Sequence, residues 1–154
     1  MASTANPDYS VNESMWFDTD LETAFTGWTD PKAIASWFGP PGYTAEILEL
    51  DLTPGGHWRF RMVPETGAPS HHSGRYVEIS RPNTLIFTWE SEEDRHLTHG
   101  RDTLVTITFT EEASGVRITI LHEHLPTQES AQSLTYGWGR GIICFGHWLR
   151  RLEE

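Results

Sequence analysis

The chain has 154 residues, a length typical of one domain with a hydrophobic core of its own. Its 11 Lys and Arg against 22 Asp and Glu give a formal net charge of −11 at pH 7. This acidity argues against nucleic acid as a partner and against docking to an anionic membrane, because both need a basic surface. No apolar run approaches the roughly 20 residues that span a bilayer. The single cysteine, Cys144, cannot form an internal disulfide, so we expect a cytoplasmic protein.

The N-terminal quarter predicts one strand followed by two short helices. Residues 1–9 are mostly small and polar, without the features of a secretory signal, and we expect them to be frayed. Residues 11–17 form a strand candidate. Asp20 can cap a first helix, and Asp30, followed by proline, has the pattern of a second helix start. The Gly-Pro-Pro-Gly sequence at 39–42 ends that second helix.

Between residues 43 and 124 the hydrophobic period changes to two residues, which is typical of strands. Apolar and polar residues alternate in six runs separated by turns, at about 43–52, 57–62, 75–79, 85–90, 103–109 and 116–120. Strands joined by such short turns predict a strongly bent antiparallel meander.

The last segment, from about Gln128 to Leu152, returns to helical period and gathers its apolar residues on one face. Gly141 lies on that face, where the missing side chain leaves room for close approach or for a ligand. We therefore predict an α+β protein with a single domain at 10–154. In this arrangement, a curved antiparallel sheet wraps around the long C-terminal helix and leaves a space beneath it.

Several segments resemble a known family in their order and spacing. They are Trp28-Thr29-Asp30-Pro31 with Trp37-Phe38-Gly39-Pro40, the Pro-Gly-Gly turn of Asp51–Trp58, the strands Gly74–Ile79 and Leu85–Trp89, and Tyr136-Gly137-Trp138. From about residue 10 to 152 the chain resembles stand-alone proteins similar to the C-terminal domain of the activator of heat-shock protein 90 ATPase. These belong to the START-related, Bet v 1-like superfamily, often called SRPBCC. The resemblance implies the helix-grip fold and a cavity between sheet and helix.

The aromatic residues supply the predicted binding site. Seven Trp and seven Phe are many for this length, and those in phase on the sheet and the helix can either line a pocket or interdigitate and fill it. We expect a pocket for an apolar or aromatic molecule, with these ligand-binding residues: Trp58, Phe60, Tyr76, Phe87, Trp89, Phe109, His122, His124, Trp138 and Phe145.

His122 and His124 lie two residues apart on a strand, so we expect both to face inward. They are compatible with a divalent metal site that a third ligand completes, with a polar end of the pocket, or with a purely structural role. No Cys, Asp or Glu spacing completes a recognised metal site, so no metal and no other cofactor is predicted. Tyr76, Glu78, His122 and Glu123 are candidate acid–base groups, but no nucleophile, base and orienting residue form a legible set, and catalysis stays open.

The function we expect is binding of a hydrophobic or aromatic small molecule without chemistry. Two alternatives stay open on the strength of the resemblance. One is a chaperone-interaction module that activates a heat-shock ATPase in the stress response, and the other is a cyclase or dehydratase that uses the same cavity. Two-fold homodimers are common among small soluble domains, so a homodimer is also an open expectation.

Overall fold

A seven-stranded antiparallel sheet forms the body of the protein. The computed structural model describes residues 8–93 and 95–153, so residues 1–7 of the segment expected to be frayed lie outside the described part. The strands are β1 (Tyr9–Phe17), β2 (Tyr43–Leu50), β3 (His57–Pro64), β4 (Ser70–Ser80), β5 (Thr84–Ser91), β6 (Thr103–Glu112) and β7 (Gly115–Leu125). Their order in the sheet is β1-β7-β6-β5-β4-β3-β2, and all neighbours are antiparallel.

The described helices are α1 (Leu21–Thr29), α2 (Pro31–Trp37), α3 (Arg95–Thr98) and α4 (Gln128–Leu152). Both predicted acidic caps are present. The Asp20 carboxylate accepts from the Thr23 backbone N–H at 2.8 Å, and the Asp30 carboxylate accepts from the Ala33 N–H at 3.1 Å. Helix α4 has the predicted bounds, whereas the single turn α3 was not predicted.

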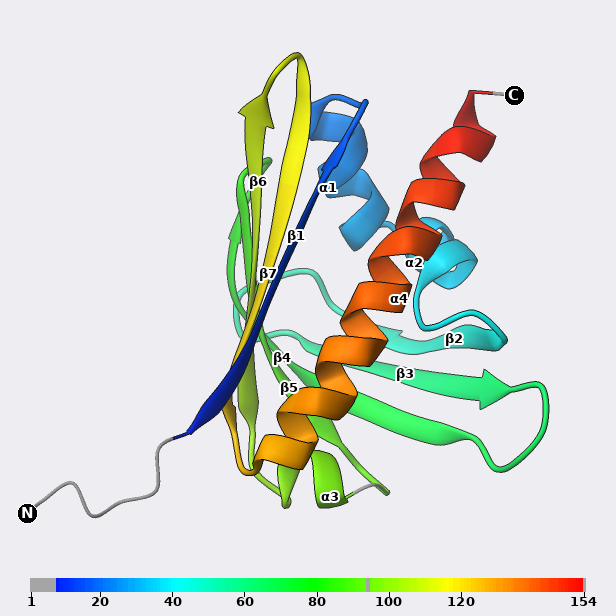
Figure 1. Ribbon diagram of the computed structural model, residues 1–154, viewed down its shortest axis with the longest axis vertical. Coiled ribbons are helices and arrows are strands. Elements are labelled where there is room, and N and C mark those ends of the chain that lie inside the picture. Colours follow the sequence, from blue (N-terminus) through cyan, green and yellow to red (C-terminus); the bar gives the residue numbers. More distant parts are fainter. Residues whose placement is uncertain (1–7, 94, 154) are drawn as a thin grey trace, which may run out of the picture.

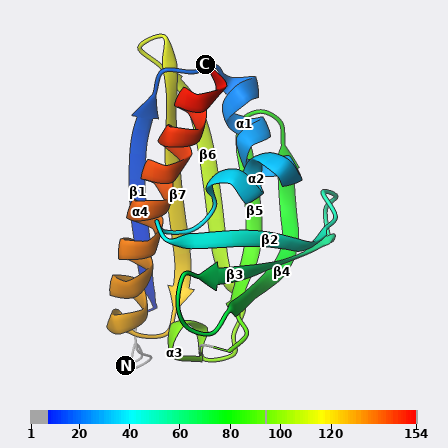
Figure 2. The same cartoon turned by 90° about the vertical axis from the view of Figure 1, so that its right-hand side faces the viewer.

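The sheet bends strongly around α4, as the predicted helix-grip fold requires. In Figure 1, strands β1, β6 and β7 run upright while β2 and β3 run across, and α4 lies over the concave face. Figure 2 shows α1 and α2 beside the C-terminal half of α4, and α3 at the opposite end. Strands β4 and β5 approach closely at Gly74, where an added Cβ would collide with the Thr88 carbonyl.

The core lies between the concave face and α4. Strands β5, β6 and β7 alternate buried and less buried residues over most of their length, as the period of two predicts. The buried face of α4 is the predicted apolar sector and includes Leu134, Trp138, Gly141, Ile142, Phe145, Trp148 and Leu149. Each large apolar side chain buried in this way contributes about 1.5–3 kcal/mol relative to exposure. The fold therefore depends on the contact of α4 with the sheet.

Candidate ligand-binding pocket

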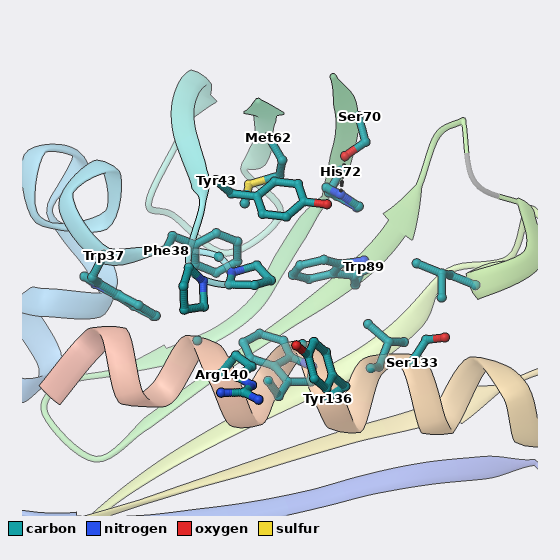
Figure 3. Close-up of a pocket in the computed structure, with 18 residues that line it drawn as sticks. Trp37, Phe38, Tyr43, Met62, Ser70, His72, Trp89, Ser133, Tyr136 and Arg140 are labelled. Carbon is teal, nitrogen blue, oxygen red and sulfur yellow. Dashed lines mark hydrogen bonds between the residues drawn. The ribbon is translucent and has the colours of Figure 1, made fainter. Parts of the chain in front are cut away.

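A pocket of about 570 Å³ opens between the N-terminal half of α4, strands β2 to β5, the loop from α2 to β2, and α3. This volume is within the range that takes a drug-sized molecule. Its described lining residues are Trp37, Phe38, Gly39, Pro40, Pro41, Tyr43, Met62, Ser70, His72, Trp89, Leu97, Ser133, Leu134, Tyr136, Gly137, Trp138, Arg140 and Gly141. Figure 3 shows Tyr43, Met62 and His72 on one side, Tyr136 and Arg140 of α4 on the other, and Phe38 and Trp89 between them.

Three aromatic rings from three different segments of the chain form the centre of the pocket wall. Trp89 of β5 and Trp138 of α4 meet edge to face, with their ring centroids 5.4 Å apart. Phe38, which follows α2, lies 6.0 Å from Trp89 and 6.2 Å from Trp138. Such rings offer a large apolar surface with preferred stacking geometries for another aromatic group.

His122 lies behind the pocket wall and is hydrogen-bonded directly to Trp138 and, through Thr103, to the backbone of Trp89. The Trp138 indole N–H donates to His122 Nδ1 at 3.0 Å, so the imidazole proton is on Nε2, which lies 2.7 Å from Thr103 Oγ1. The Thr103 hydroxyl in turn donates to the Trp89 carbonyl at 2.7 Å. Burial lowers the pKa of His122 to about 3, so the ring is neutral. Each nitrogen of His122 is thus engaged, and the residue positions the pocket wall without lining it.

His72 lines the pocket although it is not among the predicted binding residues. Strand β4 begins at Ser70, five residues before the predicted start, and so carries His72 to the pocket. Its Nδ1 lies 2.9 Å from Ser91 Oγ and its Nε2 lies 3.2 Å from Ser70 Oγ. The only signal in the sequence was its phase with Tyr76, four residues further along the same strand.

Of the ten predicted binding residues, the structure brings Trp89 and Trp138 to the pocket. Trp58, Phe60, Tyr76 and Phe87 instead surround a second cavity of only about 20 Å³, which is room for about one water molecule. Phe109 and Phe145 are packed in the core against the first two helices, as the 5.3 Å spacing of Phe25 and Phe109 and the 5.0 Å spacing of Trp37 and Phe145 show. The centre of the fold is therefore filled, and the open space lies to one side of it.

The expectation that His124 faces inward is wrong. Val11 pairs with His122 but Tyr9 pairs with Leu125, so β7 carries one extra residue at this point. His124 takes a positive φ of 66° and is half exposed, and its Nδ1 lies 3.2 Å from an Asp8 carboxylate oxygen. Leu125 takes the inward position that the alternation gave to His124.

The two histidines consequently share no face on which to hold a metal ion. Within residues 8–93 and 95–153, no group of three or more His, Cys, Asp or Glu side chains is arranged to bind one. The candidate acid–base groups also lie outside the pocket lining. They are Tyr76, Glu78, His122 and Glu123.

Two glycines of α4 leave open space at the pocket. A Cβ built on Gly137 would meet no atom within 4 Å, and one built on Gly141 would meet only the Gly39 carbonyl oxygen, at 3.9 Å. Each glycine in a helix interior costs about 1 kcal/mol relative to alanine. At Gly137 and Gly141 the helix is therefore less stable than it would be with alanine, and the space beside the pocket stays free of side chains.

A curved antiparallel sheet closed by a long C-terminal helix, with a pocket at their junction, defines a helix-grip protein. Residues 18–142 match the family model described as activator of Hsp90 ATPase homolog 1-like protein, and the chain belongs to that family. No curated protein matches the chain. In the part of the chain that the structure describes, no helix has both the length and the apolar character needed to cross a membrane.

Solved structures share this fold at low sequence identity. A protein from Silicibacter pomeroyi is 23% identical with a TM-score of 0.82, and the match covers 95% of this chain and 100% of that one. A protein from Chromobacterium violaceum is 22% identical with a TM-score of 0.81, over 90% and 94% of the two chains. A protein from Arthrobacter aurescens is 22% identical with a TM-score of 0.80, over 92% and 86%. These likenesses establish the fold.

Proposed function

We propose that this protein binds a small apolar or aromatic molecule in the pocket beside α4. The observation that carries the proposal is a space of about 570 Å³ walled by aromatic rings from separate elements, among them Phe38, Trp89 and Trp138. A ligand there would exchange water for apolar surface at roughly 25 cal/mol per Å² of buried area. Polar side chains in the lining, such as Ser133, would fix its orientation.

The glycines of α4 support the same proposal. Gly137 and Gly141 border the pocket and leave its volume free, although a helix favours almost any other residue at these positions. Gly139 lies between them in sequence and does not line the pocket. A Cβ at Gly139 would come within 3.6 Å of the end of the flexible Glu13 side chain. The three glycines thus provide a blocking site and a matched control on one helix.

Titration with the neutral fluorophore N-phenyl-1-naphthylamine tests the proposal. We expect its emission to rise on binding to the wild-type protein and to quench tryptophan emission, since Trp37, Trp89 and Trp138 line the pocket. Gly137→Phe should fill the space and weaken binding at least tenfold, whereas Gly139→Phe should bind like the wild type. The Tm of each variant is measured first, and binding is compared at a temperature at which both variants are folded. The proposal is contradicted if neither emission changes with the wild-type protein, or if the two variants bind the probe equally well.

The family description favours a second candidate, an activator of a heat-shock ATPase. This activity would require that the protein bind the chaperone and raise its turnover. An ATPase assay of Hsp90 with increasing amounts of this protein tests it, with Gly137→Phe included to separate a role of the pocket from a role of the surface. Unchanged ATP hydrolysis at saturating protein, together with no co-precipitation, rules the second candidate out.

A further inference from the structure

Arg140 brings a positive charge to the pocket lining. Among the described residues that line the pocket, no Asp or Glu occurs and Arg140 is the one Arg or Lys. The protein has twice as many acidic as basic residues, and most of its arginines are paired with them. Arginines with a carboxylate within 4 Å are Arg59, Arg61, Arg75, Arg81, Arg101 and Arg117. Within the described part of the chain, Arg140 has no carboxylate at that distance.

The guanidinium of Arg140 is held at the rim by a neighbouring ring. It lies over Tyr136, one helical turn earlier, with its central carbon 5.0 Å from the ring centroid. A guanidinium stacked in this way keeps its N–H groups directed outward in its own plane. Figure 3 shows both side chains on α4 at the edge of the pocket, on the side opposite Tyr43 and His72.

We infer that the ligand is an organic anion, with an apolar or aromatic body against Phe38 and Trp89 and its acidic group bound by Arg140. This inference rests on the proposed function. An anionic group binds an arginine through charge-assisted and often bidentate hydrogen bonds. The net charge of −11 repels an anion at long range. At about 0.15 M salt, however, charges further away than about 8 Å are largely screened, and the nearby arginine dominates.

A pair of matched fluorophores tests the inference. 8-Anilinonaphthalene-1-sulfonate is N-phenyl-1-naphthylamine with one sulfonate added, so the two differ chiefly in charge. We expect Arg140→Gln to weaken binding of the sulfonate roughly three- to tenfold and to leave the neutral probe within twofold of wild type. Arg140→Lys should retain part of the preference because it keeps the charge. Gly137→Phe should weaken binding of both probes at least tenfold, which places the probes in the pocket.

Arg150→Gln is the matched control. Arg150 lies in the last turn of α4, outside the pocket lining, and its substitution removes the same charge from the same helix. The inference is overturned if Arg140→Gln weakens both probes equally, or if Arg150→Gln weakens the sulfonate as much as Arg140→Gln does. If the wild type binds the neutral probe but not the sulfonate, the proposed function stands and this inference fails. If it binds neither, both fail.

Discussion

His122 is a candidate binding or catalytic residue in the sequence, but in the structure its role is to position Trp138. It is fully buried, and its two nitrogens are engaged by Trp138 and Thr103. A neutral imidazole with both nitrogens hydrogen-bonded has no free lone pair for a metal ion and no ready proton to transfer. Its contribution to the site is to fix the orientation of Trp138.

The buried neutral state of His122 predicts a pH dependence of stability. In the unfolded chain the imidazole takes up a proton below its ordinary pKa of 6.5, whereas in the folded protein the pKa is about 3. Between these values the unfolded state binds more protons, so the free energy of unfolding falls as the pH falls. From pH 6.5 to 5 the loss due to this group is up to about 2 kcal/mol.

Urea unfolding at pH 7.5 and 5.0 measures this loss, with His122→Gln as the comparison. Gln can hydrogen-bond but does not titrate, so the variant should be less stable than wild type at pH 7.5 and should lose less stability on acidification. The other titrating groups are common to both proteins and cancel. An identical pH slope for the two proteins would show that His122 is not held neutral.

At the scale of elements, one glycine of α4 and one of α1 show what glycine does in two different settings. Gly139 lies on α4 where an added Cβ has room, its nearest contact being the end of the Glu13 side chain at 3.6 Å. Gly27 lies on α1, and a Cβ there would come within 2.6 Å of the Phe145 and Trp148 rings of α4. One glycine lowers helix stability without any packing benefit, whereas the other allows two helices to approach.

Alanine at these two positions should therefore change stability in opposite directions. We expect Gly139→Ala to raise the free energy of unfolding by about 0.5–1 kcal/mol, through helix propensity. Gly27→Ala should lower it by about 1–3 kcal/mol, because buried rings must move to make room. Chemical denaturation of the two variants at neutral pH measures both effects. Stabilisation by Gly27→Ala would mean that α1 and α4 are packed less tightly than described.

At the scale of the whole molecule, a ligand beside α4 should stabilise the entire fold. The pocket is built from α2, α3, α4 and four strands, so unfolding destroys the site. A ligand that binds only the folded state adds about 2.7 kcal/mol when its concentration is one hundred times its Kd. For a domain of this size that corresponds to a rise in Tm of several degrees.

Thermal unfolding with and without N-phenyl-1-naphthylamine therefore provides a further prediction. The Tm of the wild type and of Gly139→Phe should rise with probe concentration, whereas the Tm of Gly137→Phe should not. The same measurement with a library of apolar acids searches for the natural ligand class. A concentration-dependent rise of equal size in Gly137→Phe would place the bound probe outside the pocket.

The sequence by itself determined the order of the seven strands and of the three longer helices, the bounds of α4 and the direction of its apolar face. Period and capping are local properties, and Asp20, Asp30 and the long amphipathic segment signal them within a few residues of chain. The tertiary structure alone decided where space remains. Phe60 and Phe145 share the aromatic pattern of Trp89 and Trp138, yet packing buried the first two in the interior and left the second two at the pocket. One extra residue in β7 turned His124 outward, because strand pairing depends on contacts between distant segments.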